Sequence, residues 1–124
     1  MVQLPASSKE LFDALFEAQA QPMWVVDAET LAFLAVNEAA LRLYGYSRRE
    51  FLALTADHIR PDEDIDDLRR AYADWSNNCS QRIWRHKTKS GEVMSVRVTS
   101  FSLEFAGRRA RLGVIEDLGE RRPE

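Results

Sequence analysis

The residues that most often carry out chemistry are few in this sequence. It contains two histidines, His58 and His86, and one cysteine, Cys79. The histidines lie far apart, and neither has a metal-ligand spacing to another histidine or to the cysteine. A single cysteine excludes a disulfide within the chain and a cysteine metal site. No metal site is therefore expected, and the sequence also lacks phosphate-loop and dinucleotide-binding motifs.

Carboxylates are the next candidates, because a carboxyl group buried in an apolar pocket can act as a general base. The acidic residues of this chain cluster at turns and helix starts, such as Asp27, Glu50 and residues 62–64. Only Glu116 and Asp117, at a strand end, are placed where they could face inward. A small α+β enzyme using one of them is kept as a minor alternative, and the main expectation is that the chain is not an enzyme.

Length, composition and charge limit the classes of protein to which the chain can belong. The chain has 124 residues, of which 45% are hydrophobic, and this suits one domain with a real core. A net charge of −3 without a basic aromatic motif argues against a nucleic-acid surface. No apolar run approaches the roughly 20 residues of a membrane helix, and the first residues lack the pattern of a secretory signal. We expect a soluble, cytoplasmic chain without a membrane segment.

The N-terminal segment is expected to form a helix. Ser7 can cap it, Glu10 completes a capping box, and Pro22 ends it. Four apolar residues recur at helical spacing and form one stripe. They are Leu11, Phe12, Leu15 and Phe16.

Two strands and a helix are expected next. MWVVD (23–27) and LAFLAV (31–36) are apolar, rich in β-formers and separated by a turn, which predicts a hairpin. Asn37 is a good cap for a helix over 38–44. Gly45 can close that helix in the left-handed conformation.

A second helix is expected to start directly after Gly45. Ser47 and Glu50 form a capping box, and Tyr46 and Phe51 have the spacing of a hydrophobic staple. Gly45 then reverses the chain while the staple fixes the angle of the new helix. This stretch is therefore expected to wrap one side of a hollow.

The rest of the chain predicts a third helix and three strands. Residues 62–64 place negative charge in a first helical turn after Pro61, which favours a helix start. One face of this helix is apolar and consists of Ile65, Leu68, Tyr72 and Trp75. After this helix the apolar residues alternate with polar ones, which is typical of strands. Strands are expected over 81–87, 92–105 and 110–118, with turns at 88–91 and 106–109.

This order of elements predicts an α+β fold, because the link from the second strand to the third passes through all three short helices. We expect a five-stranded antiparallel sheet with short helices over one face and an N-terminal helix.

Five stretches, taken in order, resemble a PAS domain across about residues 8–122. They are VVD (25–27), VNEAALRLYGYSRREF (36–51), the Pro61–Asp62 helix start, WRHKTKSGEV (84–93) and VIEDLGERR (114–122). The resemblance implies an N-terminal helix in 1–21 and a PAS core in 22–118. It also implies that 119–124 begin a C-terminal signalling connector, as in a piece of a larger sensor protein.

The resemblance implies a sensory function. PAS domains hold a small molecule, a cofactor or nothing between sheet and helices, and they signal to an output domain such as a histidine kinase or a cyclic-nucleotide enzyme, as in two-component systems. We expect a ligand-binding module of this kind; the alternative is a ligand-free module for dimerisation and relay. A homodimer is expected, with the helix stripe Leu11, Phe12, Leu15 and Phe16 as its contact.

Strand parity predicts which side chains face the cleft, because alternate residues point to opposite faces. Trp24 and Val26 face inward in the first strand. Two long cations of the third strand belong in water, so Trp84 and His86 face inward. The inward rows of the last two strands are Met94, Val96, Val98 and Ser100, then Gly113 and Ile115, and similarity to the flavin-binding branch supports these parities. The expected ligand contacts are Trp24, Val26, Tyr44, Ile59, Leu68, Tyr72, Trp84, His86, Val96, Val98 and Ile115.

Two interpretations of the aromatic residues remain open. Tryptophan walls suit a small planar ligand, but Trp24 and Trp84 can equally fill the hollow as core. His86 can be a structural histidine or a ligand contact. Asp27 and Asn37 are interpreted as structural, at a turn and a helix cap.

The cofactor is not determined by the sequence. The light-sensing flavin branch needs a cysteine where this chain has Ala56, and Cys79 lies in a later loop, so covalent flavin chemistry is not expected. Haem-binding members carry an axial histidine on the third helix, which here has none. Haem is therefore not expected either, and His58, which precedes that helix, keeps it only as a minor alternative.

Overall fold

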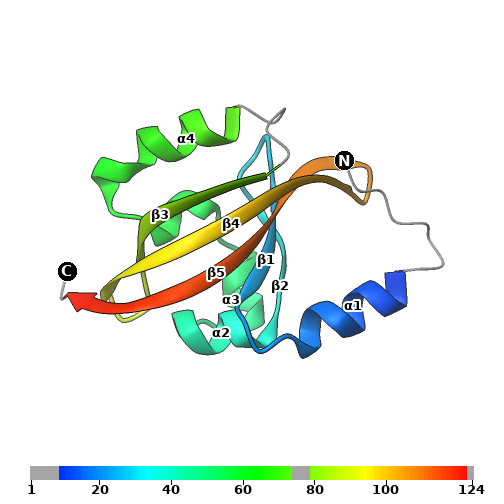
Figure 1. Ribbon diagram of the computed structural model, residues 1–124, viewed down its shortest axis with the longest axis horizontal. Coiled ribbons are helices and arrows are strands. Elements are labelled where there is room, and N and C mark those ends of the chain that lie inside the picture. The colour runs from blue at the N-terminus through cyan, green and yellow to red at the C-terminus, as the bar shows by residue number, and fades with distance from the viewer. Residues whose placement is uncertain (1–8, 74–78, 123–124) are drawn as a thin grey trace.

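The computed structural model describes residues 9–73 and 79–122, and these form one five-stranded antiparallel sheet with helices (Figure 1). The strand order is β2-β1-β5-β4-β3, and every neighbouring pair is antiparallel. This confirms the predicted α+β fold. The strands are β1 (Met23–Asp27), β2 (Phe33–Val36), β3 (Cys79–Lys87), β4 (Val93–Phe105) and β5 (Arg108–Arg122).

One face of the sheet is covered by the segment between β2 and β3. Its buried side chains form a single cluster with the inward side chains of β1, β3, β4 and β5. The segment contains two short 3₁₀ turns, η2 and η3, in addition to the three predicted helices. Its elements are α2 (Glu38–Tyr44), α3 (Arg48–Leu52), η2 (Ala56–Ile59), η3 (Asp62–Asp64) and α4 (Ile65–Ala73).

The capping signals of the second helical start are confirmed. Gly45 has a φ of 88° and its N–H donates to Leu41 at 2.9 Å. The Ser47 hydroxyl accepts from the Glu50 N–H, while the Glu50 carboxylate accepts from the Ser47 N–H. The rings of Tyr46 and Phe51 lie 5.4 Å apart, as the staple requires. The chain therefore reverses at Gly45 and returns onto the sheet.

Asn37 caps α2 as predicted and also joins three other segments. Its Oδ1 accepts from the N–H groups of Ala40 and Met23, both at 3.0 Å. Its Nδ2 donates to the carbonyls of Phe16 and Gln21 at 3.1 and 3.0 Å. A fully buried amide that satisfies four backbone groups fixes the end of α1, the start of β1 and the start of α2 relative to one another.

The last strand is longer than predicted. It runs over Arg108–Arg122 rather than 110–118 and pairs with β4 from Phe105↔Arg108 to Val93↔Arg122. The turn is only Ala106 and Gly107, which both have positive φ and therefore match the twist of a tight hairpin. The polar residues after 118 continue the ladder, and their expected role as the start of a connector stays a prediction.

The N-terminal helix α1 (Lys9–Ala18) ends before Pro22, and its apolar stripe is divided. Phe16 is buried with Val25, Leu103 and Ala110 on the outer face of the sheet, and the ring of Phe12 stacks on Phe16 at 5.5 Å. Leu11 and Leu15 remain exposed. Phe16 is therefore covered by the sheet and Phe12 only in part, and a dimer contact through this helix stays a prediction. The predicted cap Ser7 and the helix residue Trp75 lie outside the described residues.

We expect Phe51→Ala to lower the free energy of unfolding by about 3–5 kcal/mol. Phe51 is fully buried, with its ring centroid 4.8 Å from Phe33 and 5.6 Å from Tyr44. Denaturant unfolding measures the loss. The matched control is Leu52→Ala, at an exposed position of the same helix, which should cost less than about 1 kcal/mol. Equal losses in the two variants would show that Phe51 is not part of the core.

Candidate functional site

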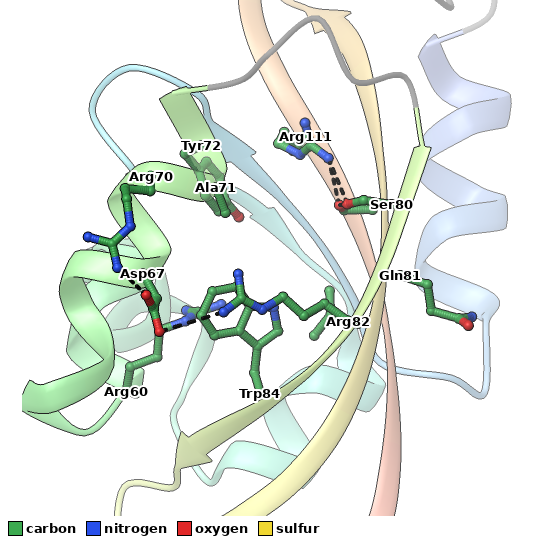
Figure 2. Close-up of a pocket in the computed structure, with 12 residues that line it drawn as sticks. Arg60, Asp67, Arg70, Ala71, Tyr72, Ser80, Gln81, Arg82, Trp84 and Arg111 are labelled. Carbon is green, nitrogen blue, oxygen red and sulfur yellow. Dashed lines mark hydrogen bonds and ion pairs between the residues drawn. The ribbon is translucent and has the colours of Figure 1, made fainter.

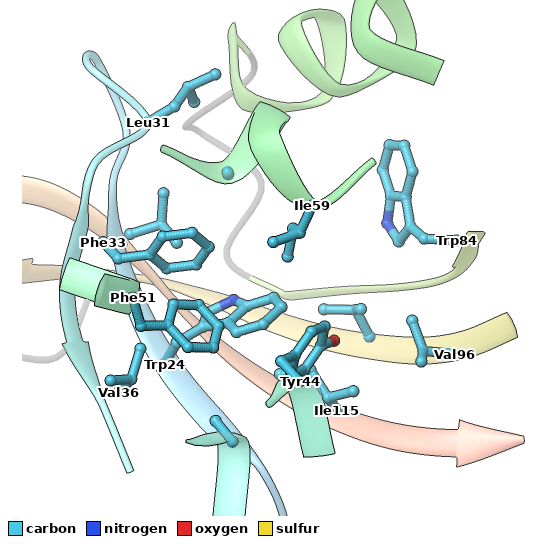
Figure 3. Close-up of a cluster of buried hydrophobic side chains, with 14 of the residues drawn as sticks. Trp24, Leu31, Phe33, Val36, Tyr44, Phe51, Ile59, Trp84, Val96 and Ile115 are labelled. Atoms are coloured by element: carbon cyan, nitrogen blue, oxygen red, sulfur yellow. The ribbon is translucent and has the colours of Figure 1, made fainter. Parts of the chain in front are cut away.

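An aromatic cluster fills the part of the cleft next to β1 (Figure 3). The buried Trp24 indole lies at its centre, with ring centroids 5.2 Å from Phe33, 5.4 Å from Tyr44, 6.1 Å from Phe51 and 5.6 Å from His86. Aromatic pairs at these separations stabilise a core beyond the area they bury. For Trp24 the interpretation as core therefore holds: its indole packs against the chain's own rings.

Gly113 on β5 makes room for this indole. A Cβ at position 113 would lie 2.5 Å from Nε1 of Trp24, a distance that real Cβ atoms do not reach. Trp24 and Gly113 are register partners across the β1–β5 pair. The predicted inward parity of Gly113 is thus confirmed, and its missing side chain lets Trp24 lie directly on the sheet.

His86 is buried beside this cluster and is neutral. Burial and the nearby Arg60 cation hold the pKa of His86 well below its usual range. Burial also raises the pKa of Tyr44, so its hydroxyl keeps its proton and donates to His86 Nδ1 at 2.6 Å. The histidine proton then sits on Nε2, which has no hydrogen-bond partner among the described residues.

A cavity of about 400 Å³ lies beyond the aromatic cluster, between α4 and strands β3, β4 and β5 (Figure 2). We call it the α4 cavity. Two aromatic and two small apolar side chains supply its apolar wall: Ala71, Tyr72, Trp84 and Val98.

Charged residues make up much of the rest of the lining. They are Arg60, Asp67, Arg70, Arg82 and Arg111. The Arg82 guanidinium lies 4.0 Å from the Trp84 ring centroid, and that of Arg60 lies 4.9 Å from it. Both contacts are within the range of cation–π attraction.

Serine hydroxyls hold the third of these guanidinium groups. Arg111 is buried and donates to the hydroxyls of Ser80, Ser100 and Ser102 at 3.1, 2.8 and 3.1 Å. Ser80 and Ser100 belong to neighbouring strands and also line the cavity. The arrangement fixes a buried positive charge in the floor of the α4 cavity.

A family model described as PAS domain matches residues 10–84, more than half of the chain. The chain belongs to the PAS domain family. The predicted resemblance is confirmed. No curated protein matches the sequence.

Solved structures show the same fold. A PAS domain from a two-component sensor histidine kinase has a TM-score of 0.75 at 23% identity, and the alignment covers 90% of this chain and 98% of the other. The PAS domain of an HTR-like protein from Haloarcula marismortui has a TM-score of 0.78 at 21% identity, with 90% and 93% covered. A domain of a sensory box sensor histidine kinase/response regulator from Geobacter sulfurreducens has a TM-score of 0.73 at 26% identity, with 89% and 94% covered.

The residues predicted to contact a ligand divide between the two parts of this PAS domain. Three of them, Tyr72, Trp84 and Val98, line the α4 cavity. The other eight are buried in the core: Trp24, Val26, Tyr44, Ile59, Leu68, His86, Val96 and Ile115. Sequence reasoning missed Arg60, Arg82 and Arg111 as cavity residues, although strand parity places Arg82 on the face of Trp84 and Arg111 on the face of Gly113.

The carboxylates considered for an enzyme do not face an apolar pocket. Glu116 is exposed and its carboxylate lies 2.7 Å from the Arg97 guanidinium. Asp117 is exposed and paired with Arg121, whose hydrogen bond lowers the pKa of the carboxyl group. A general base needs a raised pKa, and neither residue has the inward placement that the enzyme alternative requires.

The residues considered for flavin attachment or haem ligation do not line the α4 cavity. Ala56 is a buried methyl group in η2, and Cys79 is exposed at the start of β3. His58 is exposed and its Nδ1 accepts from the Thr55 N–H at 3.2 Å. Within 9–73 and 79–122 there is no cluster of three metal-ligating side chains. No helix in these ranges is long and apolar enough to cross a membrane.

The buried neutral His86 predicts a pH dependence of stability. The unfolded chain takes up a proton at His86 below about pH 6.5, while the folded chain does not, so the free energy of unfolding should fall as the pH drops below this value. The slope contributed is at most about 1.4 kcal/mol per pH unit. Burial raises the pKa of Tyr44, so its hydroxyl stays neutral in this window, and the arginine side chain of Arg60 keeps its charge.

Urea unfolding of wild type and His86→Gln between pH 5 and 7.5 measures this slope. The variant keeps an acceptor for the Tyr44 hydroxyl but cannot titrate, so its slope should be smaller than that of wild type. His58→Gln, at the other histidine, is the control. If His58→Gln removed the slope and His86→Gln kept it, the assignment to His86 would be wrong.

Proposed function

We propose that this PAS domain is a sensory module that binds a small molecule in the α4 cavity and passes the signal to an output domain. The observation that carries the proposal is the cavity itself. Its volume of about 400 Å³ lies in the range of small-molecule sites, and Trp84 and Tyr72 offer it aromatic walls. Two of the similar structures carry descriptions as domains of sensor histidine kinases, which supports an output of that kind.

Strands β4 and β5 are the proposed route of the signal. Val98 and Ser100 of β4 and Arg111 of β5 line the cavity, and the two strands pair along their whole length to Val93↔Arg122. A ligand that moves Ser100 or Arg111 therefore acts on the ribbon that ends the described chain. A change in the twist or end position of this ribbon would be transmitted to an output domain joined beyond β5.

A ligand-free dimerisation and relay module is the second candidate, and α1 favours it. Leu11 and Leu15 are 63% and 56% exposed on this helix, next to the Phe12–Phe16 pair that packs on the sheet. Exposed leucines one helical turn apart suit contact with a second copy of the chain. A homodimer is compatible with either candidate.

Native mass spectrometry of the protein purified from its own host tests the first candidate. We expect an added mass of a small organic molecule on the wild-type chain. Ala71→Phe places a ring in the α4 cavity and should remove that mass without unfolding the domain, since the cavity has room for the ring.

Ala73→Phe is the matched control, because Ala73 is an exposed position of the same helix. This variant should keep the added mass. A wild-type protein of bare chain mass, monomeric or dimeric, would contradict ligand binding and favour the ligand-free candidate.

A further inference from the structure

The α4 cavity is positively charged although the chain as a whole carries a net charge of −3. Among the described residues that line it, four are arginines and one is an acid. This acid, Asp67, is shared by the guanidinium groups of Arg70 and Arg82, the latter at 3.6 Å. Asp67 thus pairs with the two exposed arginines of the lining, and it forms no ion pair with the buried Arg60 among the described residues.

Arg60 is the most exceptional of these cations. It is only 2% exposed. Its Nη1 donates to the Ala56 carbonyl at 2.6 Å, whereas its Nε has no hydrogen-bond partner among the described residues. Arg60 also forms no ion pair, since within the described ranges no carboxylate oxygen lies within 4.0 Å of its guanidinium group. A buried, permanently charged guanidinium with a free donor is costly unless an anion approaches it.

The environment of Arg60 offers only partial compensation. The Trp84 ring and the Ala56 carbonyl both stabilise the charge, but neither supplies a negative charge. The carboxylates of Asp57 and Asp64 favour the charge from a distance, and neither forms an ion pair with Arg60 among the described residues. A carboxylate or similar planar acid group matches the guanidinium edge and can accept two parallel hydrogen bonds. The buried Arg111, held by serine hydroxyls in the same cavity, adds a second positive charge that favours an anion there.

The wall beside Arg60 suits a flat ring. Arg82 covers the Trp84 indole at 4.0 Å, yet its side chain is 48% exposed and its pair with Asp67 is long (Figure 2). Such a pair contributes little, so Arg82 is held on the indole mainly by the cation–π contact, which a ligand ring stacked on Trp84 would replace. The indole face, together with Tyr72 and Val98, then offers an apolar surface that a compact inorganic anion would not use.

We propose that the ligand of the α4 cavity is an organic anion with a planar ring, whose acid group pairs with Arg60 and whose ring lies against Trp84. This inference rests on the proposed ligand-binding function and names the chemical class of its ligand. Arg111 contributes to the positive potential, and Arg82 is displaced from the indole or closes over the ring. Aromatic carboxylates are the simplest molecules of this class.

Calorimetric titration of the purified domain with 2-naphthoate, 2-naphthamide and inorganic phosphate tests the inference. The amide has the ring without the charge, and phosphate has the charge without the ring. We expect 2-naphthoate to bind at least tenfold more tightly than either, and its affinity to fall as the NaCl concentration rises. The same order should appear in the rise of the melting temperature, because a ligand that binds only the folded state stabilises it.

Arg60→Met separates binding from folding. Replacing a buried charge by an apolar side chain of similar length is often neutral or stabilising, so the variant should keep its melting temperature without ligand. It should lose tenfold or more in affinity for 2-naphthoate. Arg97→Met is the matched control, because Arg97 lies on β4, pairs with Glu116 and does not line the cavity; it should bind as wild type does. If Arg60→Met does not fold, Arg60→Lys takes its place and should also lose affinity, because lysine lacks the guanidinium fork.

The outcomes distinguish this inference from the proposed function. Equal binding of 2-naphthamide and 2-naphthoate, or unchanged affinity in the Arg60 variant, would overturn the anionic ligand and leave a ligand-binding cavity. Phosphate binding as tightly as 2-naphthoate would contradict the inference that the ligand has a planar ring. If none of the probes binds and the native protein has its bare mass, both the inference and the ligand-binding function are wrong. An anionic aromatic molecule in the native mass spectrum would support both.

Discussion

The contact between the Trp24 indole and the bare backbone of Gly113 determines how the space between sheet and helices is divided. A side chain at position 113 would occupy the place of the indole nitrogen. Because the indole lies close to the β5 backbone at Gly113, the rings of Phe33, Tyr44 and Phe51 can close over it. This half of the cleft is packed as a core, and open volume is left towards α4.

Arg60 couples the two halves of this space. It lies 4.9 Å from the Trp84 ring on the cavity side, and its charge also lowers the pKa of His86 on the core side. The chain therefore keeps a neutral histidine and a charged arginine in one buried region. The imidazole, hydrogen-bonded to the Tyr44 hydroxyl, stays neutral because charging it would place a further cation beside the buried Arg60.

The parts of this structure that are local in sequence were the most predictable. Asn37, Gly45 and the Ser47–Glu50 pair each satisfy backbone groups within four residues, so their residue types alone indicate helix ends. Strand parity also placed Trp24, Trp84 and His86 correctly, because alternation is a property of the backbone. The length of β5 was not predictable in this way, since its polar end is held by pairing with β4 rather than by burial.

The site was harder to predict because its cations violate the usual preference of charge for water. Arg82 has the parity of Trp84, but it was not considered as a cavity residue; its guanidinium stays on that face by stacking on the indole. Arg111 is buried because hydroxyls of three serines surround it, and two strands must align before those serines meet. The burial of Phe16 and the exposure of Leu11 and Leu15 were also not predictable from the helix alone. Which residues of the stripe are covered depends on where α1 packs on the outer face of the sheet.

The long β4–β5 ribbon connects the α4 cavity with the C-terminal end of β5. One part of it lines the cavity through Val98, Ser100 and Arg111 and is held by buried hydrogen bonds. Towards Val93 and Arg122 its ion pairs, such as Arg121 with Asp117, lie at the surface, where such pairs contribute little to stability. Side-chain hydrogen bonds thus hold the ribbon at the cavity, whereas its C-terminal end is held mainly by the backbone ladder between β4 and β5. This difference supports the proposal that a ligand in the cavity signals through the end of β5.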